Sequence, residues 1–227
     1  MTRRFPAPAA AALACLAALA ACRGDDPGAP RRVAGDSAAV SPAPPPAWRA
    51  NPAAGPTLGG TADSVVIETG PHSIAWPTGE HELAPPYTIR ATFDKKRGRL
   101  HEGYGVIFGG SGLEGPEQGQ VYSYFLVRGD GSFLVKRRQG GETPVVRDWT
   151  QHPAIRRDVD ETGGPNRLEV AVSDTVAVFR VNGTEVARVP SAELSVRGLA
   201  GVRTAHECLL VVRGFGAEPG AADGGER

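Results

Sequence analysis

Short apolar stretches separated by turn-forming residues make up most of the chain between residues 62 and 217. Val, Ile, Phe and Tyr gather in the stretches, while Gly, Pro, Asp and Asn gather between them, a pattern typical of β-strands joined by tight turns. Apart from the N-terminal segment, no stretch repeats apolar residues at helical spacing over about ten positions, so no helix is predicted in this region. The pattern predicts about eleven strands, enough for two antiparallel sheets packed face to face. The predicted strands are Ser64–Thr69, Tyr87–Phe93, Gly103–Phe108, Val121–Arg128, Ser132–Arg138, Pro144–Trp149, Arg167–Ser173, Val176–Val181, Glu185–Val189, Leu199–Thr204 and Cys208–Phe215.

Two dipeptides predict the hairpins in this pattern. Asp130-Gly131 and Asn182-Gly183 each separate two predicted strands. Both dipeptides accept the positive φ angles that a two-residue type I′ turn requires. The strands on either side of each dipeptide are therefore expected to pair directly.

The first hairpin supplies a candidate ligand-binding surface. A two-residue turn places Tyr122, Tyr124 and Arg128 on one face of the sheet, with Arg137 opposite Tyr124 on the same face. Aromatic rings beside a guanidinium group can stack on a sugar ring while the guanidinium donates hydrogen bonds to its hydroxyls. The alternative is that Tyr124 is a half-buried sheet residue covered by the aliphatic stem of Arg137.

Several stretches occur in the order found in a known superfamily of β-sandwiches. They are Tyr104-Gly105-Val106-Ile107-Phe108, Tyr122-Ser123-Tyr124-Phe125-Leu126-Val127, Asn166-Arg167-Leu168-Glu169-Val170, Phe179-Arg180-Val181-Asn182-Gly183 and Leu209–Phe215. In that order they resemble the concanavalin A-like lectin/glucanase superfamily, including its laminin-G-like branch. The resemblance implies an all-β jelly-roll sandwich. It implies no activity, because this fold carries lectins, hydrolases and adhesion modules alike.

The N-terminus has the features of an export signal. Arg3 and Arg4 precede an unbroken run of small apolar residues from Ala9 to Ala21, which is too short to span a bilayer and has the length of a secretory signal. The run ends in Leu19-Ala20-Ala21-Cys22, which resembles the lipobox of bacterial lipoproteins. The resemblance implies that residues 1–21 are removed and that Cys22 carries the lipid.

A lipid on Cys22 would anchor the protein to a membrane. Arg23 follows the cysteine, which by resemblance to the enteric sorting rule favours the outer membrane of the cell envelope over the inner one. Residues 22–61 are rich in Pro and Ala and lack periodicity, so they predict a disordered tether. A short disordered tail is predicted over residues 218–227.

Charge and composition narrow the function classes. The chain has 25 Lys and Arg against 25 Asp and Glu, so no net field attracts nucleic acid. Its 30 glycines and 20 prolines suit a turn-rich β-domain more than a helical bundle. A retaining glucanase of the resembled fold would carry Glu-x-Asp-x-x-Glu on a strand, and the sequence has no such motif.

One acidic segment fits part of a calcium loop. Asp158, Asp160 and Thr162 alternate before a glycine, and Glu169 stands at the twelfth position, as oxygen ligands do in such loops. The alternative is an acidic surface loop that joins two strands. No other cofactor is predicted.

These patterns together predict a lipid-anchored envelope protein that presents a non-catalytic β-sandwich. Its expected role is recognition of a glycan or of another envelope protein, and it is expected to act as a monomer. Two alternatives remain open: a glycoside hydrolase-like enzyme of the same fold, and a structural spacer module without a ligand.

Overall fold

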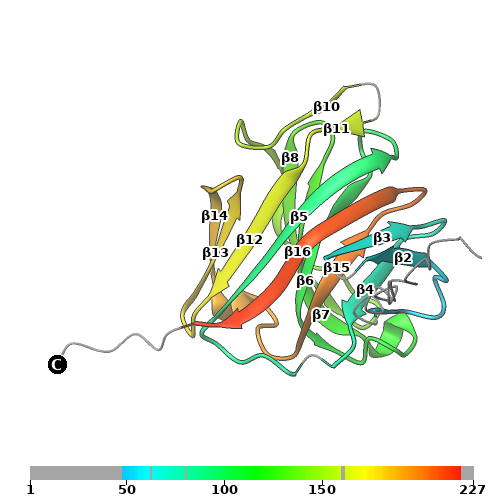
Figure 1. Cartoon of the computed structure of the whole chain (residues 1–227). Coiled ribbons are helices and arrows are strands. Elements are labelled where there is room, and N and C mark those ends of the chain that lie inside the picture. The colour runs from blue at the N-terminus through cyan, green and yellow to red at the C-terminus, as the bar shows by residue number, and fades with distance from the viewer. Residues whose placement is uncertain (1–47, 62, 80, 160–161, 221–227) are drawn as a thin grey trace, which may run out of the picture. The chain divides into compact units, whose positions relative to one another are not determined.

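The computed structural model describes residues 48–61, 63–79, 81–159 and 162–220, the side chain of Thr162 excepted. These residues form two seven-stranded antiparallel sheets packed face to face, which confirms the predicted all-β sandwich. In Figure 1, strands β12, β5 and β16 lie in front, and β6, β7 and β15 lie behind them. Among the described residues, no helix is long and apolar enough to cross a membrane.

We name each sheet after one of its strands. The β7 sheet contains, in spatial order, β1 (Trp48–Ala50), β4 (Ser73–Pro77), β15 (Leu199–Thr204), β6 (Gly103–Ser111), β7 (Val121–Arg128), β8 (Ser132–Gln139) and β9 (Val145–Gln151). The β5 sheet contains β14 (Thr184–Pro190), β13 (Val176–Val181), β12 (Asn166–Val172), β5 (Tyr87–Arg97), β16 (Leu209–Pro219), β3 (Ser64–Glu68) and β2 (Thr57–Thr61). A two-stranded ribbon of β10 (Asp158–Val159) and β11 (Thr162–Gly163) and the short 3₁₀ turns Glu117–Gly119 and Ser191–Glu193 complete the described elements.

The inward faces of the two sheets form one hydrophobic core. Alternate residues of each strand point inward because the side-chain period of a strand is two. Phe125 of the β7 sheet meets Phe179 of the β5 sheet with ring centroids 5.2 Å apart, and Phe108 lies 6.1 Å from the same ring. Cys208 is fully buried, and burial raises the pKa of its thiol to about 11. The thiol therefore packs as a small apolar group.

The sandwich begins earlier than the sequence predicts. The tether was predicted to run to residue 61, but β1 pairs with β4 and β2 pairs with β3. The ring of Trp48 packs edge-on against Phe215 with centroids 5.2 Å apart. The tether prediction is wrong for residues 48–61 because strands this short are held by distant partners, which local periodicity does not reveal. Residues 22–47, the signal segment and most of the predicted tail lie outside the described residues.

The two hairpins have different turns. At Asn182-Gly183 both residues have positive φ, 51° and 85°, and Val181 pairs with Thr184, as the predicted two-residue turn requires. The turn before β8 is instead a three-residue connection. There the Gly131 amide donates to the Arg128 carbonyl at 3.0 Å, and Gly131 has a φ of 84°, which is the type I turn with a glycine bulge.

This three-residue turn shifts the pairing of β7 and β8 by one residue from the prediction. Tyr124 lies opposite Lys136, and Arg137 lies opposite Ser123. Since neighbouring residues of a strand point to opposite faces, the shift reverses every side chain of β8. The predicted pairing of Tyr124 with Arg137 is therefore wrong.

Candidate functional site

The outer face of the β7 sheet carries a second apolar layer, separate from the core. Four central strands and the segment after β6 contribute to it, and its members are nearly as buried as core residues. A sheet face that borders solvent is normally polar. Because no third sheet packs on this face among the described residues, other side chains must shield the layer from solvent. Its fully buried members are Ile74, Trp76, Ile107, Leu113, Tyr122, Tyr124, Leu126 and Leu134.

Arginine side chains provide part of that cover by stacking on the aromatic rings. The Arg128 guanidinium lies 4.2 Å from the centroid of the Trp149 ring, and the Arg203 guanidinium lies 5.1 Å from that of Tyr124. Only 5% of Tyr124 is exposed. A planar guanidinium can shield an aromatic face and still keep its donors toward solvent. The alternative of a covered Tyr124 therefore holds, although Arg203 covers the ring and Arg137 does not.

A glycine on β6 lets Arg203 reach these rings. Gly105 lies opposite Arg203 of β15 on one side and opposite Leu126 of β7 on the other. Because Gly105 has no side chain on this face, the Arg203 side chain can extend across β6 to Tyr122 and Tyr124. Its Nη1 donates a hydrogen bond to Tyr122 Oη at 3.0 Å.

The hydroxyl of Tyr122 joins two guanidinium groups. Arg138 Nε donates to Tyr122 Oη at 3.2 Å, and Arg203 Nη1 donates to the same oxygen. Glu117 accepts from Arg138 Nη1 at 3.2 Å, and its other oxygen lies 2.6 Å from His72 Nε2. One carboxylate therefore serves a histidine and a guanidinium in a half-buried network.

Burial and charge shift the pKa values of this acid and this histidine. Burial lowers the pKa of His72, and the hydrogen bond with Glu117 only partly opposes that effect. The hydrogen bond from His72, helped by the charge of Arg138, lowers the pKa of Glu117. At neutral pH a neutral His72 consequently donates its Nε2 proton to an ionised Glu117.

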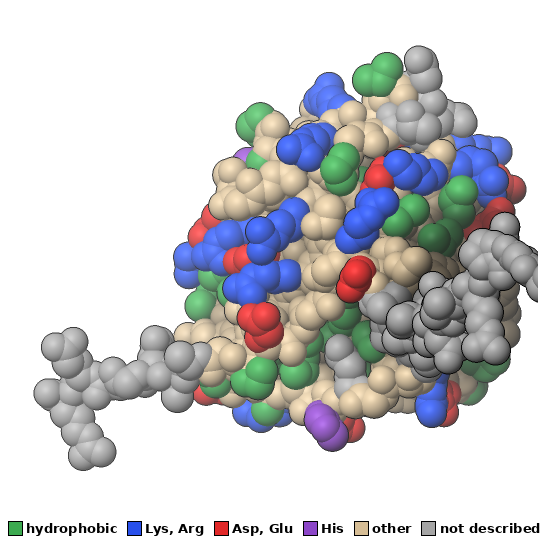
Figure 2. Space-filling view, viewed as in Figure 1, with side chains coloured by type: hydrophobic (Ala, Val, Ile, Leu, Met, Phe, Trp, Pro, Cys, Tyr) green, Lys and Arg blue, Asp and Glu red, His purple; other side chains and the backbone are tan. Residues whose placement is uncertain are grey.

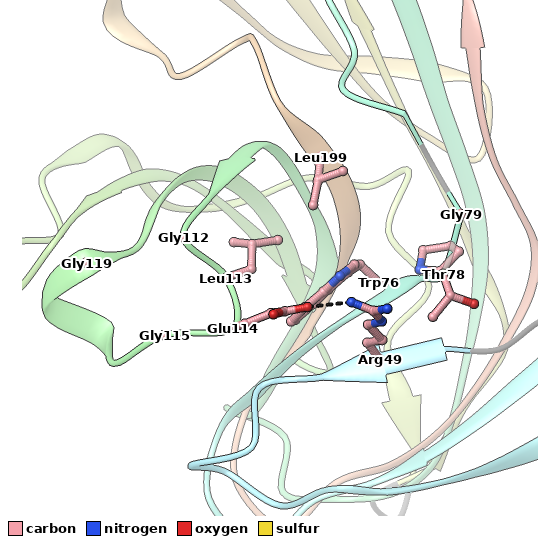
Figure 3. A pocket seen from close by; sticks show the side chains of 11 residues that line it. Arg49, Trp76, Thr78, Gly79, Gly112, Leu113, Glu114, Gly115, Gly119 and Leu199 are labelled. Atoms are coloured by element: carbon pink, nitrogen blue, oxygen red, sulfur yellow. Dashed lines mark hydrogen bonds and ion pairs between the residues drawn. The ribbon is translucent and has the colours of Figure 1, made fainter.

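Two hollows border this surface. The larger, of about 500 Å³, is lined by Trp76, Leu113 and Leu199, with an ion pair of 2.6 Å between Arg49 and Glu114. Figure 3 shows this ion pair next to Trp76.

The smaller hollow, of about 160 Å³, lies beside the Tyr122 network. Its lining includes Ile74, Tyr122 and Arg203, together with His72 and Glu117. One wall is thus apolar and the other charged, which suits a ligand with both kinds of surface.

The structure brings together three of the four residues that the sequence singled out for ligand binding. Tyr122, Tyr124 and Arg128 lie on the outer face of the β7 sheet, while Arg137 belongs to the opposite face by its pairing with Ser123. Sequence reasoning missed four further contributors to this surface, because the predicted turn put Arg138 on the opposite face of β8 and because the places of β4, β9 and β15 in the sheet depend on topology. These contributors are Trp76, Arg138, Trp149 and Arg203.

Asp158 and Glu169, two of the residues predicted as calcium ligands, do not share a site. The Asp158 side chain is fully buried, and its Oδ2 lies 2.5 Å from the equally buried Lys95 Nζ. Glu169 lies on the outer face of the β5 sheet, where its two oxygens pair with Arg90 at 3.0 Å and Arg180 at 2.8 Å. The predicted joint site is therefore wrong for Asp158 and Glu169, because each is already neutralised by a different partner.

The remaining two predicted ligands, Asp160 and the side chain of Thr162, lie outside the described residues. Within the described part of the chain, no three histidine, cysteine or acidic side chains are grouped as metal ligands would be. Figure 2 shows the outer face of the β5 sheet, where basic and acidic side chains are interleaved. That face differs from the aromatic outer face of the β7 sheet.

Solved structures with this fold include carbohydrate-binding proteins. The carbohydrate-binding module CBM66 of Bacillus subtilis is similar with a TM-score of 0.58 and 12% identity, over 75% of this chain and 94% of that one. A Bacillus subtilis protein of unknown function with a galectin-like fold has a TM-score of 0.57 and 13% identity, over 75% of this chain and 88% of its own. At these identities the likeness shows the fold alone. Comparisons with protein families and with curated proteins find no match.

Proposed function

We propose that this protein is a lipid-anchored cell-envelope protein whose sandwich binds a glycan, without catalysis, on the outer face of the β7 sheet. The observation that carries the proposal is the partly exposed Trp149 ring with the Arg128 guanidinium stacked on it, at the edge of the aromatic layer of that face. Apolar ring faces and planar donors are the two elements that sugar recognition needs. The two solved structures above support it, since one is by its title a carbohydrate-binding module and the other has a galectin-like fold.

The carboxylates at this face favour binding over hydrolysis. Glycosidases commonly use two carboxyl groups about 5 to 10 Å apart. Each hollow at the β7 sheet is lined by one carboxylate, Glu114 in the larger and Glu117 in the smaller. Both are already held in ion pairs, Glu114 with Arg49 and Glu117 with Arg138. We therefore place the enzymatic alternative behind recognition.

A glycan array probed with the full chain tests the binding proposal. We expect retained glycans, and we expect Arg128→Ala to weaken retention about tenfold because it removes the donors stacked on Trp149. Arg188→Gln is the matched control, since Arg188 is an exposed arginine on β14 of the other sheet that forms an ion pair with Glu185. An array without any retained glycan contradicts the proposal, as does equal retention by Arg128→Ala and the parent chain.

The anchor is a separate part of the proposal. It rests on the apolar run that ends in Leu19-Ala20-Ala21-Cys22 and on its resemblance to a lipobox. Two or three acyl chains on Cys22 would hold the protein firmly, since each buried methylene contributes about 0.8 kcal/mol. Arg23 favours the outer membrane as its location.

Radiolabelled palmitate tests the anchor in cells. We expect the parent chain to incorporate the label and to sediment with membranes, and Cys22→Ser to do neither. Cys15→Ser is the control, because Cys15 lies within the segment expected to be removed. Undiminished labelling of Cys22→Ser contradicts the assignment of the acylated residue.

A further inference from the structure

Two cations on the outer face of the β7 sheet have no ion-pair partner among the described residues, whereas the acids beside them do. Three acids around the stacked arginines each have a cationic partner, whereas the carboxylate of Asp148 on the edge strand β9 accepts only from the Trp149 amide among the described residues. The three ion pairs are Glu114 with Arg49, Asp130 with Arg128, and Glu117 with Arg138. Arg203 and Lys136, also on this face, lie within 4 Å of no carboxylate among the described side chains.

The Arg203 guanidinium has no direct ion-pair partner among the described side chains, and Glu117 acts on it only at longer range. Its guanidinium and that of Arg138 converge on the single hydroxyl oxygen of Tyr122, at 3.0 Å and 3.2 Å. Glu117 pairs with Arg138, but no carboxylate pairs with Arg203. Two like charges directed at one oxygen repel each other in a half-buried site. An anion bound beside Arg203 would remove that repulsion.

Arg203 also has donors available for such an anion. Its side chain makes one hydrogen bond within the described residues, from Nη1, so Nε and Nη2 have no acceptor there. It lines the smaller hollow, where a ligand can reach it. A guanidinium with two adjacent free donors matches the geometry of a carboxylate or sulfate group.

Lys136 places a second unpaired cation on the other side of Tyr124. It lies directly opposite Tyr124 on β8, whereas Arg203 stacks on that ring from β15. The backbones of the two cations are three strand spacings apart, about 14 Å across the sheet. An extended oligosaccharide that crosses the strands over Tyr124 would meet both charges.

We propose that Arg203 and Lys136 form an anion subsite that selects acidic saccharides, whose carboxylate or sulfate groups pair with these two cations. The inference rests on the proposed glycan binding and names the class of glycan. It requires no change in the fold, because both cations are already in place on this face.

The test compares polysaccharides that differ in charge alone. We expect the full chain to bind polygalacturonate at least about tenfold more tightly than its methyl ester, with an affinity that falls as salt is added. The second pair is dextran sulfate and dextran. If the chain prefers dextran sulfate to dextran but does not distinguish polygalacturonate from its ester, the subsite is assigned to sulfate esters. Arg203→Gln and Lys136→Gln should each reduce the preference about tenfold, and Arg203→Lys should retain part of it.

Arg167→Gln is the matched control, because Arg167 is an exposed cation on the outer face of the β5 sheet with no ion pair among the described residues. The Lys136 side chain makes no hydrogen bond or ion pair within the described residues, so Lys136→Gln tests the subsite without disturbing the fold. Equal binding of the charged and uncharged member in both pairs overturns the anion subsite and leaves glycan binding intact. A charge preference that Arg203→Gln and Lys136→Gln leave unchanged overturns it as well. Retention of no glycan at all, including the neutral ones on the array, contradicts the proposed function itself.

Discussion

Replacing Lys95 with methionine is expected to lower the free energy of unfolding by about 3 to 5 kcal/mol, because it leaves the Asp158 carboxylate buried without its counter-charge. Both side chains are fully buried, and Lys95 Nζ also donates to the Arg99 carbonyl at 2.9 Å. For a domain of this size the loss corresponds to roughly 6 to 20 °C in the melting temperature. Urea denaturation followed by tryptophan fluorescence measures the change.

A double-mutant cycle separates the ion pair from simple packing. Asp158→Asn keeps the shape of the side chain and should cost a similar amount, since it leaves the lysine without its counter-charge. In the double variant Lys95→Met with Asp158→Asn no buried charge remains, so we expect it to be more stable than either single variant. Losses that simply add would show that the two groups do not interact, contrary to their 2.5 Å separation.

The position of Asp158 depends on two neighbouring glycines. A Cβ atom at Gly129 would lie 2.1 Å from Asp158 Oδ2, and one at Gly163 would lie 2.1 Å from Oδ1. The carboxylate thus occupies a slot that exists because both neighbours lack side chains. In the sequence Asp158 looked like the first oxygen of a calcium loop. Its true partner lies 63 positions away on β5, which no local pattern reveals.

The sequence predicted best those strands and turns whose bounds are set by neighbouring residues in the chain. Three strands, Val121–Arg128, Val176–Val181 and Leu199–Thr204, have the predicted bounds, because apolar β-branched and aromatic residues fill them between clear turn signals. The Asn182-Gly183 turn was also predicted, since both residues accept positive φ. Strand β4, which holds Trp76 and ends at Pro77, is absent from the predicted strands because a proline in a short apolar run argues against a strand.

The sequence predicted the tyrosines of the candidate site but not the cations beside them. The alternation of β7 places Tyr122 and Tyr124 on one face whatever the turn. The residue opposite Tyr124 on β8 changes when the turn is one residue longer. The predicted two-residue turn at Asp130-Gly131 therefore gave Arg137, whereas the three-residue turn gives Lys136. The contribution of Arg203 depends on β15 lying beside β6, which is a matter of topology.

Replacing Gly109 with alanine is expected to cost at least about 3 kcal/mol, from left-handed backbone strain of about 1 to 2 kcal/mol together with steric overlap. Gly109 has a φ of 61°, and a Cβ atom there would lie 2.1 Å from the Ser195 carbonyl oxygen. Ser195 has little freedom to withdraw, since its amide donates to the Oγ of the fully buried Ser123 at 2.8 Å. Thermal unfolding followed by circular dichroism, or the soluble yield, measures the effect.

Gly183→Ala is the matched control, because Gly183 has a φ of 85° but no atom within 4 Å of the added methyl group. It should carry only the strain, about 1 to 2 kcal/mol. Equal losses at the two glycines would show that Ser195 yields and that the overlap is not the cause. The difference bears on function because Gly109 lies at the bulge where β6 shifts register before Ser111. That bulge leads the chain into the segment that carries Glu114 and Glu117 over the outer face of the β7 sheet. If Gly109→Ala folds with this segment displaced, both hollows should change, since Glu114 lines the larger and Glu117 the smaller.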